Sequence, residues 1–213
     1  MSNFEYIISS LPYLTMDFKY SGQAGFNSVI SDIKRDLDEH DQDFVDFLIK
    51  GFSDKELDAD FYAQALKGRN RFLREYFRFD LNLRNAKVRY LNAQLGREPD
   101  LDLMTGEDPE AEDVDIDGYR FTGGEFEEAL KVDAILSNTD LVAREKGLDD
   151  ILWDKIDSLA TFHYFDIEAV LAYIAKLHIV TRWLKLDEEV GRDVFRRLLK
   201  DVRGTYKGVN YTE

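Results

Sequence analysis

The residues with the clearest chemical potential form a short acidic run at positions 113–118, with the sequence Asp-Val-Asp-Ile-Asp-Gly. Alternating aspartates followed by a glycine at the sixth position open a calcium-binding EF-hand loop. The twelfth position should then be a glutamate that binds calcium through both oxygens, but Gly124 stands there. The valine and isoleucine also occupy places where such loops have polar residues. The pattern favours a small β-hairpin around Asp117-Gly118 over a metal site.

The three histidines do not fit a metal-binding spacing. None of His40, His163 and His178 follows a glutamate by three residues, and the His-Glu-x-x-His zinc pattern is absent. His40-Asp41 is a dipeptide found in metal phosphohydrolases, but no other histidine lies in the first half of the chain. We expect His40 to lie at the end of the first long helix, where positive charge is favourable. The sequence predicts no metal ion, no cofactor and no catalytic residue.

Phosphate-binding signals are also missing. Neither a Gly-x4-Gly-Lys-Ser/Thr loop nor a Gly-x-Gly-x-x-Gly turn occurs, and Gly123-Gly124 follows the most acidic part of the chain. Arginines recur between Arg69 and Arg89, interleaved with aromatic residues, in a pattern that could bind nucleic acid. In so acidic a chain we expect these cations to pair with carboxylates of the protein instead. Nucleic acid is therefore not a predicted partner.

Composition narrows the class of protein. The 213 residues carry a net charge of −15, and cysteine is absent, which excludes disulfides and thiolate metal sites. Such a charge repels phosphate backbones and anionic lipid surfaces. No apolar run approaches the roughly 18 residues of a membrane-spanning helix, and the N-terminus lacks the features of a signal peptide. We expect a cytoplasmic protein that meets a membrane only through a complex.

Helical periodicity dominates the elements that must position these residues. Apolar residues spaced three and four apart predict helices over 26–37, 41–51, 60–95, 125–136, 148–162, 166–184 and 188–202. Asn27 or Ser28 is a plausible cap for the first, and Ser53 to Glu56 has capping-box spacing. The first dozen residues lack helical spacing and predict a strand or an extended arm. Gly68 interrupts the long central helix and predicts a bend.

The middle of the chain differs from the rest. Ten acidic residues lie between Glu98 and Asp117, which predicts an acidic loop. The fold class that follows is all-α, a multi-helix bundle of antiparallel helices with this loop and hairpin inserted. We predict an N-terminal helical half over 1–97, the insertion over 98–124 and a C-terminal helical half over 125–213. The two halves could be related subdomains within one compact unit.

Two segments resemble the central-stalk connector protein of V/A-type rotary ATPases, a family with archaeal, bacterial and eukaryotic members. Residues 165–176, Phe-Asp-Ile-Glu-Ala-Val-Leu-Ala-Tyr-Ile-Ala-Lys, followed by Arg182-Trp183, are similar to a late helix of that family. Residues 72–77, Phe-Leu-Arg-Glu-Tyr-Phe, and the polar positions after them are similar to its central helix. The resemblance implies structural or interface roles for seven positions, which are Asp80, Asn85, Arg89, Tyr173, Lys176, Arg182 and Trp183.

Over nearly its whole length the chain looks closer to an uncharacterised bacterial family associated with V-type ATPases. Residues 6–12, Tyr-Ile-Ile-Ser-Ser-Leu-Pro, and residues 153–157, Trp-Asp-Lys-Ile-Asp, carry that likeness. The resemblance implies a non-catalytic connector of the central stalk, whose partners are the rotor ring and the central axle. The chain is shorter than a usual connector of this kind, so fewer helical subdomains are expected. The alternative is a helical adaptor or regulatory module, unrelated to rotary ATPases, that binds a basic partner through the acidic loop.

Overall fold

The computed structural model describes residues 2–17, 19–22, 24–104, 126 and 128–185. These residues form α-helices and no named strand, with a single antiparallel bridge between Leu14 and Tyr20, so the predicted all-α class is confirmed. The helices are α1 (Phe4–Ser10), α2 (Phe26–Asp36), α3 (Glu39–Lys50), α4 (Ala59–Leu66), α5 (Arg71–Gln94), α6 (Ala129–Leu136), α7 (Leu141–Ala160) and α8 (Ile167–Lys185). No helix among the described residues is long and apolar enough to cross a membrane.

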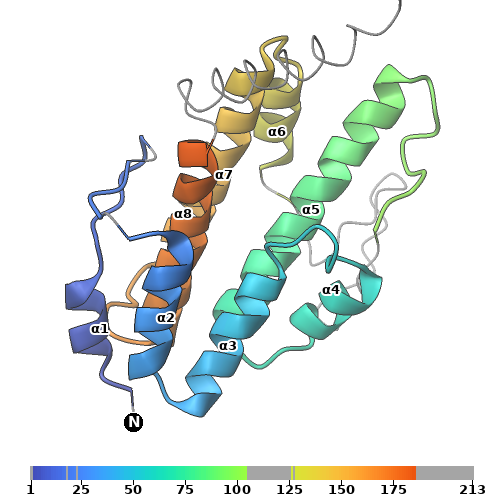
Figure 1. Cartoon of the computed structure of the whole chain (residues 1–213). Coiled ribbons are helices and arrows are strands. Elements are labelled where there is room, and N and C mark those ends of the chain that lie inside the picture. The colour runs from blue at the N-terminus through green and yellow to red at the C-terminus, as the bar shows by residue number, and fades with distance from the viewer. Residues whose placement is uncertain (1, 18, 23, 105–125, 127, 186–213) are drawn as a thin grey trace, which may run out of the picture.

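Helix α8 lies at the centre of the bundle. It packs against α1, α2, α3, α5 and α7 (Figure 1). Buried residues occur all around it rather than along one stripe, because neighbours cover it on several sides. Its 19 residues span about 28 Å, and α7 runs antiparallel beside it. Together, α7 and α8 contact α1, α2, α3, α5 and α6.

In the part of the chain that the structure describes, the buried apolar side chains divide into two clusters. The larger cluster contains residues of the helices α1, α2, α3, α4, α5, α7 and α8, and it includes Tyr62, Phe77 and Trp153. The smaller one lies where α6 packs against α5 and α7. Its members are Phe79, Leu83, Phe126, Val132, Leu136, Leu148 and Ile151. Helices α5 and α7 contribute to both clusters and therefore connect them.

The beginning of the chain corrects one expectation. Residues predicted as an extended arm form helix α1, because the Asn3 side chain accepts a hydrogen bond from the Tyr6 N–H and caps it. One face of this short helix still packs into the body, since Ile7 is only 2% exposed. Leu11 before Pro12 is extended, as predicted.

The central helical stretch is also divided more sharply than expected. Ser53 starts no helix; instead Asp58 caps α4 by accepting from the Phe61 N–H. The chain then reverses around Gly68, and Asn70 caps α5, so α4 and α5 are separate helices packed on each other. The prediction of a bend within one helical stretch at Gly68 is therefore wrong, because the helix ends before it and a new one begins after it.

Other boundaries shift by a few residues. Helix α2 begins after Gly25 without a side-chain cap, so neither Asn27 nor Ser28 caps it. Helix α7 begins at Leu141, seven residues before the predicted start, because Asp140 caps it. It ends at Ala160, so Phe162 lies outside it. The predicted hairpin around Asp117-Gly118, the calcium-like run and the last predicted helix lie outside the described residues.

Candidate interaction site at the α7–α8 turn

Three aromatic side chains stand exposed on the turn between α7 and α8. Phe162 is 83% exposed, Tyr164 67% and Phe165 57%. Leaving such side chains in water forgoes the stabilisation that burial would give. Aromatic residues gathered on a surface are typical anchors of protein–protein contacts. The turn is therefore the strongest candidate contact surface among the described residues.

Local hydrogen bonds fix the shape of this turn. The Asp166 carboxylate accepts from the Ala169 N–H at 3.0 Å, as an N-cap of α8 does, and its other oxygen lies 2.6 Å from His163 Nδ1. The His163 N–H donates to the Ala160 carbonyl at the end of α7. Phe162 adopts a positive φ of 73°, a strained conformation for a bulky residue. Strain held this way by its surroundings is often found at functional positions.

A groove of about 390 Å³ lies beside the turn. Residues 11–14 form one wall and the start of α8 forms the other, with Trp153 of α7 also lining it. Tyr13, 74% exposed, and Tyr164 both line the groove. The Tyr173 hydroxyl donates a hydrogen bond to the Pro12 carbonyl at 2.9 Å and so connects α8 to residues 11–14. An apolar groove with exposed aromatic residues beside it can receive an apolar side chain of a partner.

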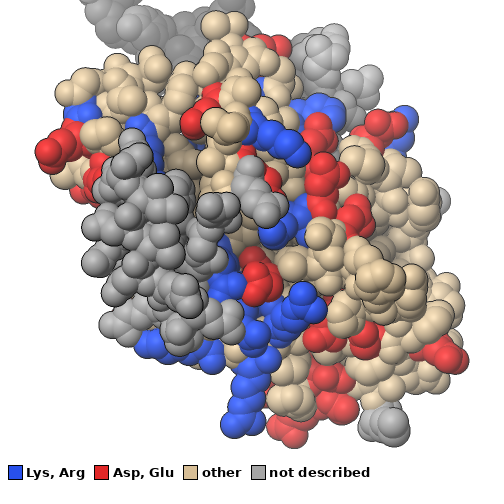
Figure 2. Space-filling view, turned by 180° about the vertical axis from the view of Figure 1, so that it is seen from behind, with Lys and Arg blue, Asp and Glu red and all other residues tan. Residues whose placement is uncertain are grey.

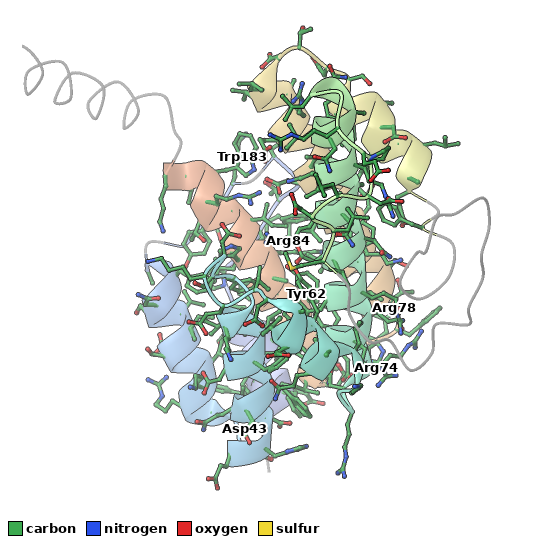
Figure 3. All side chains as sticks on the ribbon, turned by 90° about the vertical axis from the view of Figure 1, so that its right-hand side faces the viewer. Asp43, Tyr62, Arg74, Arg78, Arg84 and Trp183 are labelled. Carbon is green, nitrogen blue, oxygen red and sulfur yellow. The ribbon has the colours of Figure 1, made fainter. Side chains whose placement is uncertain are left out.

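The first sequence-selected position on α5, Asp80, belongs to a partly buried polar network. It accepts hydrogen bonds from the Tyr62 hydroxyl of α4 at 2.6 Å and from Arg84 Nε at 2.9 Å. Tyr62 and Arg84 lie near each other in Figure 3. Burial, and then the Asp80 carboxylate, raise the pKa of Tyr62. Burial alone would lower the pKa of Arg84, but Asp80 and Tyr62 raise it above its ordinary value. The network ties α4 to α5.

The other two α5 positions hold the segment that follows the helix. Asn85 is buried and exchanges two hydrogen bonds with the backbone of Met104, at 2.8 and 3.0 Å. Arg89 Nε donates to the Asp100 carboxylate at 2.8 Å. Asn92, one helical turn farther on, donates to the carbonyls of Pro99 and Leu101. Together these side chains fold residues 99–104 back along α5.

The selected positions on α8 attach it to its neighbours. Besides the Tyr173 contact with Pro12, Lys176 pairs with Asp157 of α7 and lies 4.8 Å from the Trp153 ring centroid. Arg182 and Trp183 both donate to Asp149 of α7, the latter through Nε1 at 2.6 Å. The Asp149 side chain is only 6% exposed. All seven selected positions therefore join separate parts of the fold, but they do not meet in one site.

Among the residues that the structure describes, one group of side chains has ligand types suited to a metal ion. His163, Asp166 and Glu168 offer ligand atoms within 4.8 Å of one another. Each already has a role in the fold, because His163 bonds Asp166, Asp166 caps α8, and Glu168 accepts from Asn70 at 3.3 Å. The closeness of these three side chains is therefore explained by the hydrogen bonds at the start of α8.

The remaining histidines occupy different environments. His40 lies in the first turn of α3, not at the end of a helix as predicted, and its ring packs edge-on against Phe44. His178 stacks on Phe52 with ring centroids 4.0 Å apart. Burial, and then the cations of Arg182 and Lys185, lower the pKa of His178 to about 4. His178 is therefore uncharged at neutral pH.

The arginine series on α5 pairs largely within the protein, as the sequence predicted. Arg78 donates to Glu75, Arg84 donates to Asp80, and Arg89 donates to Asp100. Figure 2 shows basic side chains gathered toward the lower left and centre of one face, while acidic ones are frequent on the right. Charge on this face is therefore segregated, although the chain as a whole is acidic.

Sequence reasoning missed the exposed turn and the acceptor Asp149. The turn has a visible signal, because Tyr164 and Phe165 fall between the predicted helices 148–162 and 166–184, directly after Phe162 at the end of the first. Asp149 has no such signal, since an aspartate on a helix is usually a solvated residue. Its partners lie 33 and 34 residues farther along the chain.

Comparison with known proteins identifies a family. A family model described as "Protein of unknown function (DUF2764)" matches residues 49–205, which are 157 of the 213 residues. The matched range contains α4 to α8 and the exposed turn, whereas α1 and α2 precede it. No curated protein and no solved structure matches the chain.

Proposed function

The chain belongs to the DUF2764 family of unknown function, and we propose that it is a non-catalytic connector in the central stalk of a V-type rotary ATPase. In this role it joins the central axle to the membrane rotor ring and transmits force by contact. The resemblance of α5 and α8 to the connector protein of V/A-type enzymes supplies the identity of the complex. The cytoplasmic location at a membrane surface follows from that complex and is part of the proposal.

The observation that carries the proposal is the exposed aromatic turn on the α7–α8 hairpin. A connector needs a contact surface fixed to a stiff body, because a yielding body would absorb the force. Phe162, Tyr164 and Phe165 supply the surface, and close-packed interiors transmit strain. The ion pairs of α8 with Asp149 and Asp157 further attach the two helices of the hairpin to each other.

The test is co-purification of the tagged full-length chain from its native host in mild detergent, with mass spectrometry of the recovered proteins. We expect rotor-ring and axle proteins to accompany the wild-type chain. A triple variant, Phe162→Asn, Tyr164→Ser and Phe165→Ser, should lower their recovery about tenfold or more, since aromatic anchors commonly contribute about 2 kcal/mol or more. All three side chains are exposed, so the variant should remain folded.

A matched control removes three other exposed apolar side chains at the α6–α7 end. The variant Leu130→Ser, Leu141→Ser and Val142→Ser, whose residues are 83%, 67% and 64% exposed, should retain the partners. Recovery of other proteins, with the ATPase components absent although expressed, would overturn the rotary-ATPase assignment. Equal losses in both triple variants would overturn the role of the turn.

A further inference from the structure

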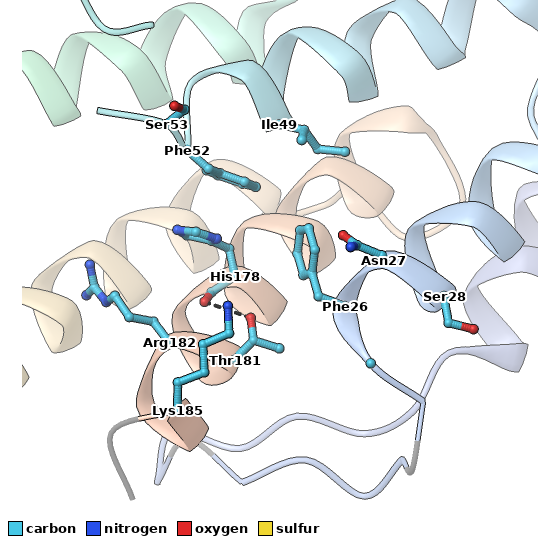
Figure 4. Close-up of a pocket in the computed structure, with 11 residues that line it drawn as sticks. Phe26, Asn27, Ser28, Ile49, Phe52, Ser53, His178, Thr181, Arg182 and Lys185 are labelled. Atoms are coloured by element: carbon cyan, nitrogen blue, oxygen red, sulfur yellow. Dashed lines mark hydrogen bonds between the residues drawn. The ribbon is translucent and has the colours of Figure 1, made fainter. Parts of the chain in front are cut away.

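A second hollow lies at the opposite end of α8 from the aromatic turn. It has a volume of about 520 Å³ and is bounded by the start of α2, the end of α3 and the last turns of α8 (Figure 4). Pockets of this size accommodate small molecules rather than single ions. It shares no lining residue with the groove beside the turn.

The pocket is basic although the chain is strongly acidic. Arg182 and Lys185 extend from the last turns of α8 and line it. Asp149 engages Arg182 through Nη2, but a guanidinium carries five N–H donors and its side chain remains 45% exposed. Among the described residues, no carboxylate pairs with Lys185. Two cations are therefore placed where they can meet a negatively charged group.

Backbone donors add to this charge at the opposite wall. Gly25 precedes α2 and offers no side-chain cap, and within the described residues the N–H groups of Phe26 and Asn27 have no hydrogen-bond acceptor. Both residues line the pocket. The first N–H groups of a helix point outward along its axis and favour anions. They reinforce the two cations rather than form a site alone.

Aromatic side chains make the floor of the pocket largely apolar. Phe26 meets the His178 ring edge-on with centroids 6.0 Å apart, and Phe52 stacks against the same ring. Ile49 lines the pocket beside them. Such a floor suits an aromatic or aliphatic body, and the cations above it suit an oxyanion attached to that body.

We propose that this pocket binds a small organic oxyanion, a phosphate or carboxylate carried on a flat apolar group. Lys185 and Arg182 hold the oxyanion, and the rings of Phe26 and Phe52 contact the apolar group. The site is independent of the proposed connector role, because the aromatic turn lies at the other end of α8. Neutral His178 acts as a reporter beside the ligand, flanked by Arg182 and Lys185 on its own helix and by Asp54 after α3.

The experiment is an NMR titration of the full-length protein with three probes. Phenyl phosphate combines charge and ring, inorganic phosphate supplies the charge alone, and phenol supplies the ring alone. We expect phenyl phosphate to bind about tenfold more tightly than either of the others, shifting the His178 ring signals and the Phe26 and Asn27 amides. Binding should also raise the pKa of His178 from about 4, because the anion offsets the neighbouring cations.

Two variants separate a built site from general charge attraction. Lys185→Gln should weaken phenyl phosphate binding about fivefold to tenfold. Lys131→Gln, which removes an exposed lysine on α6 away from the pocket, should leave binding unchanged. Equal weakening by both variants, or shifts that map to another surface, would overturn the proposal. Inorganic phosphate binding as tightly as phenyl phosphate would overturn the apolar half of the ligand assignment.

Discussion

Replacing Asp149 by alanine tests whether the α7–α8 hairpin is held by its buried carboxylate. The change removes the acceptor of both Arg182 and Trp183, while Asp149 itself is 4% exposed. Breaking a buried pair usually costs about 3–5 kcal/mol. Because the Arg182 side chain is 45% exposed and water can solvate it, we expect the lower end, about 3 kcal/mol. Asp149→Asn retains an oxygen that can accept from Trp183 and should cost less than the alanine variant.

The assay is urea unfolding followed by circular dichroism, with Asp150→Ala as the control. Asp150 is the next residue in the same helix and makes an exposed pair with Lys146, so its loss should cost less than about 1 kcal/mol. Both variants change helix propensity equally, which leaves the buried contacts as the difference. If Asp149→Ala proved no more destabilising than Asp150→Ala, the idea that this carboxylate secures the hairpin would be refuted.

The remaining predictions concern the core, a close backbone contact and pH. Tyr62→Phe removes the hydroxyl that donates a hydrogen bond to Asp80, and it should lower the free energy of unfolding by about 1 kcal/mol in urea titrations. An unchanged free energy of unfolding would contradict a stabilising role for this hydrogen bond. Gly51→Ala places a methyl 2.3 Å from an aromatic ring of α5 and should cost about 1–3 kcal/mol, while Gly25→Ala, with nothing within 4 Å, should meet no clash. The pKa of His178 is about 4 in the folded chain, against an ordinary value of 6.5. As the pH falls from about 6.5 to 4, His178 therefore binds a proton in the unfolded chain but not in the folded one, and the free energy of unfolding decreases. His178→Gln should reduce that decrease by roughly 1–3 kcal/mol, and an unchanged pH profile would contradict the assignment.

The helical class could be predicted because apolar spacing and punctuation are local properties. The end of α3 at Gly51 and the separation between α7 and α8 both follow from such signals. Errors occurred where one side chain decides. Asn3 caps α1 in a segment without helical spacing, and Asp58 rather than Ser53 starts α4. A capping pattern in sequence shows which residue can cap, whereas tertiary packing selects the one that does.

The candidate sites were less accessible because their parts meet only in three dimensions. Asp80 was selected, but its contact with Tyr62 requires α4 to fold back on α5. The pocket near α8 joins Phe26 and Phe52 to Lys185, which lies more than a hundred residues farther along the chain. No pattern of residue spacing within a single helix could predict that these side chains meet. The aromatic turn is the exception, because its signal lies within a few consecutive residues.

The division of the interior into two apolar clusters has a consequence for how the molecule opens. The small cluster around α6 contains seven buried residues, whereas α8 lies wholly against the large cluster. Amide protons of α6 should therefore exchange with solvent through a sub-global opening of low free energy. Amides in the middle of α8 should exchange only when the entire chain unfolds. Because α5 and α7 continue into both clusters, their two ends should differ in protection, and the boundary between fast and slow exchange should fall within single helices.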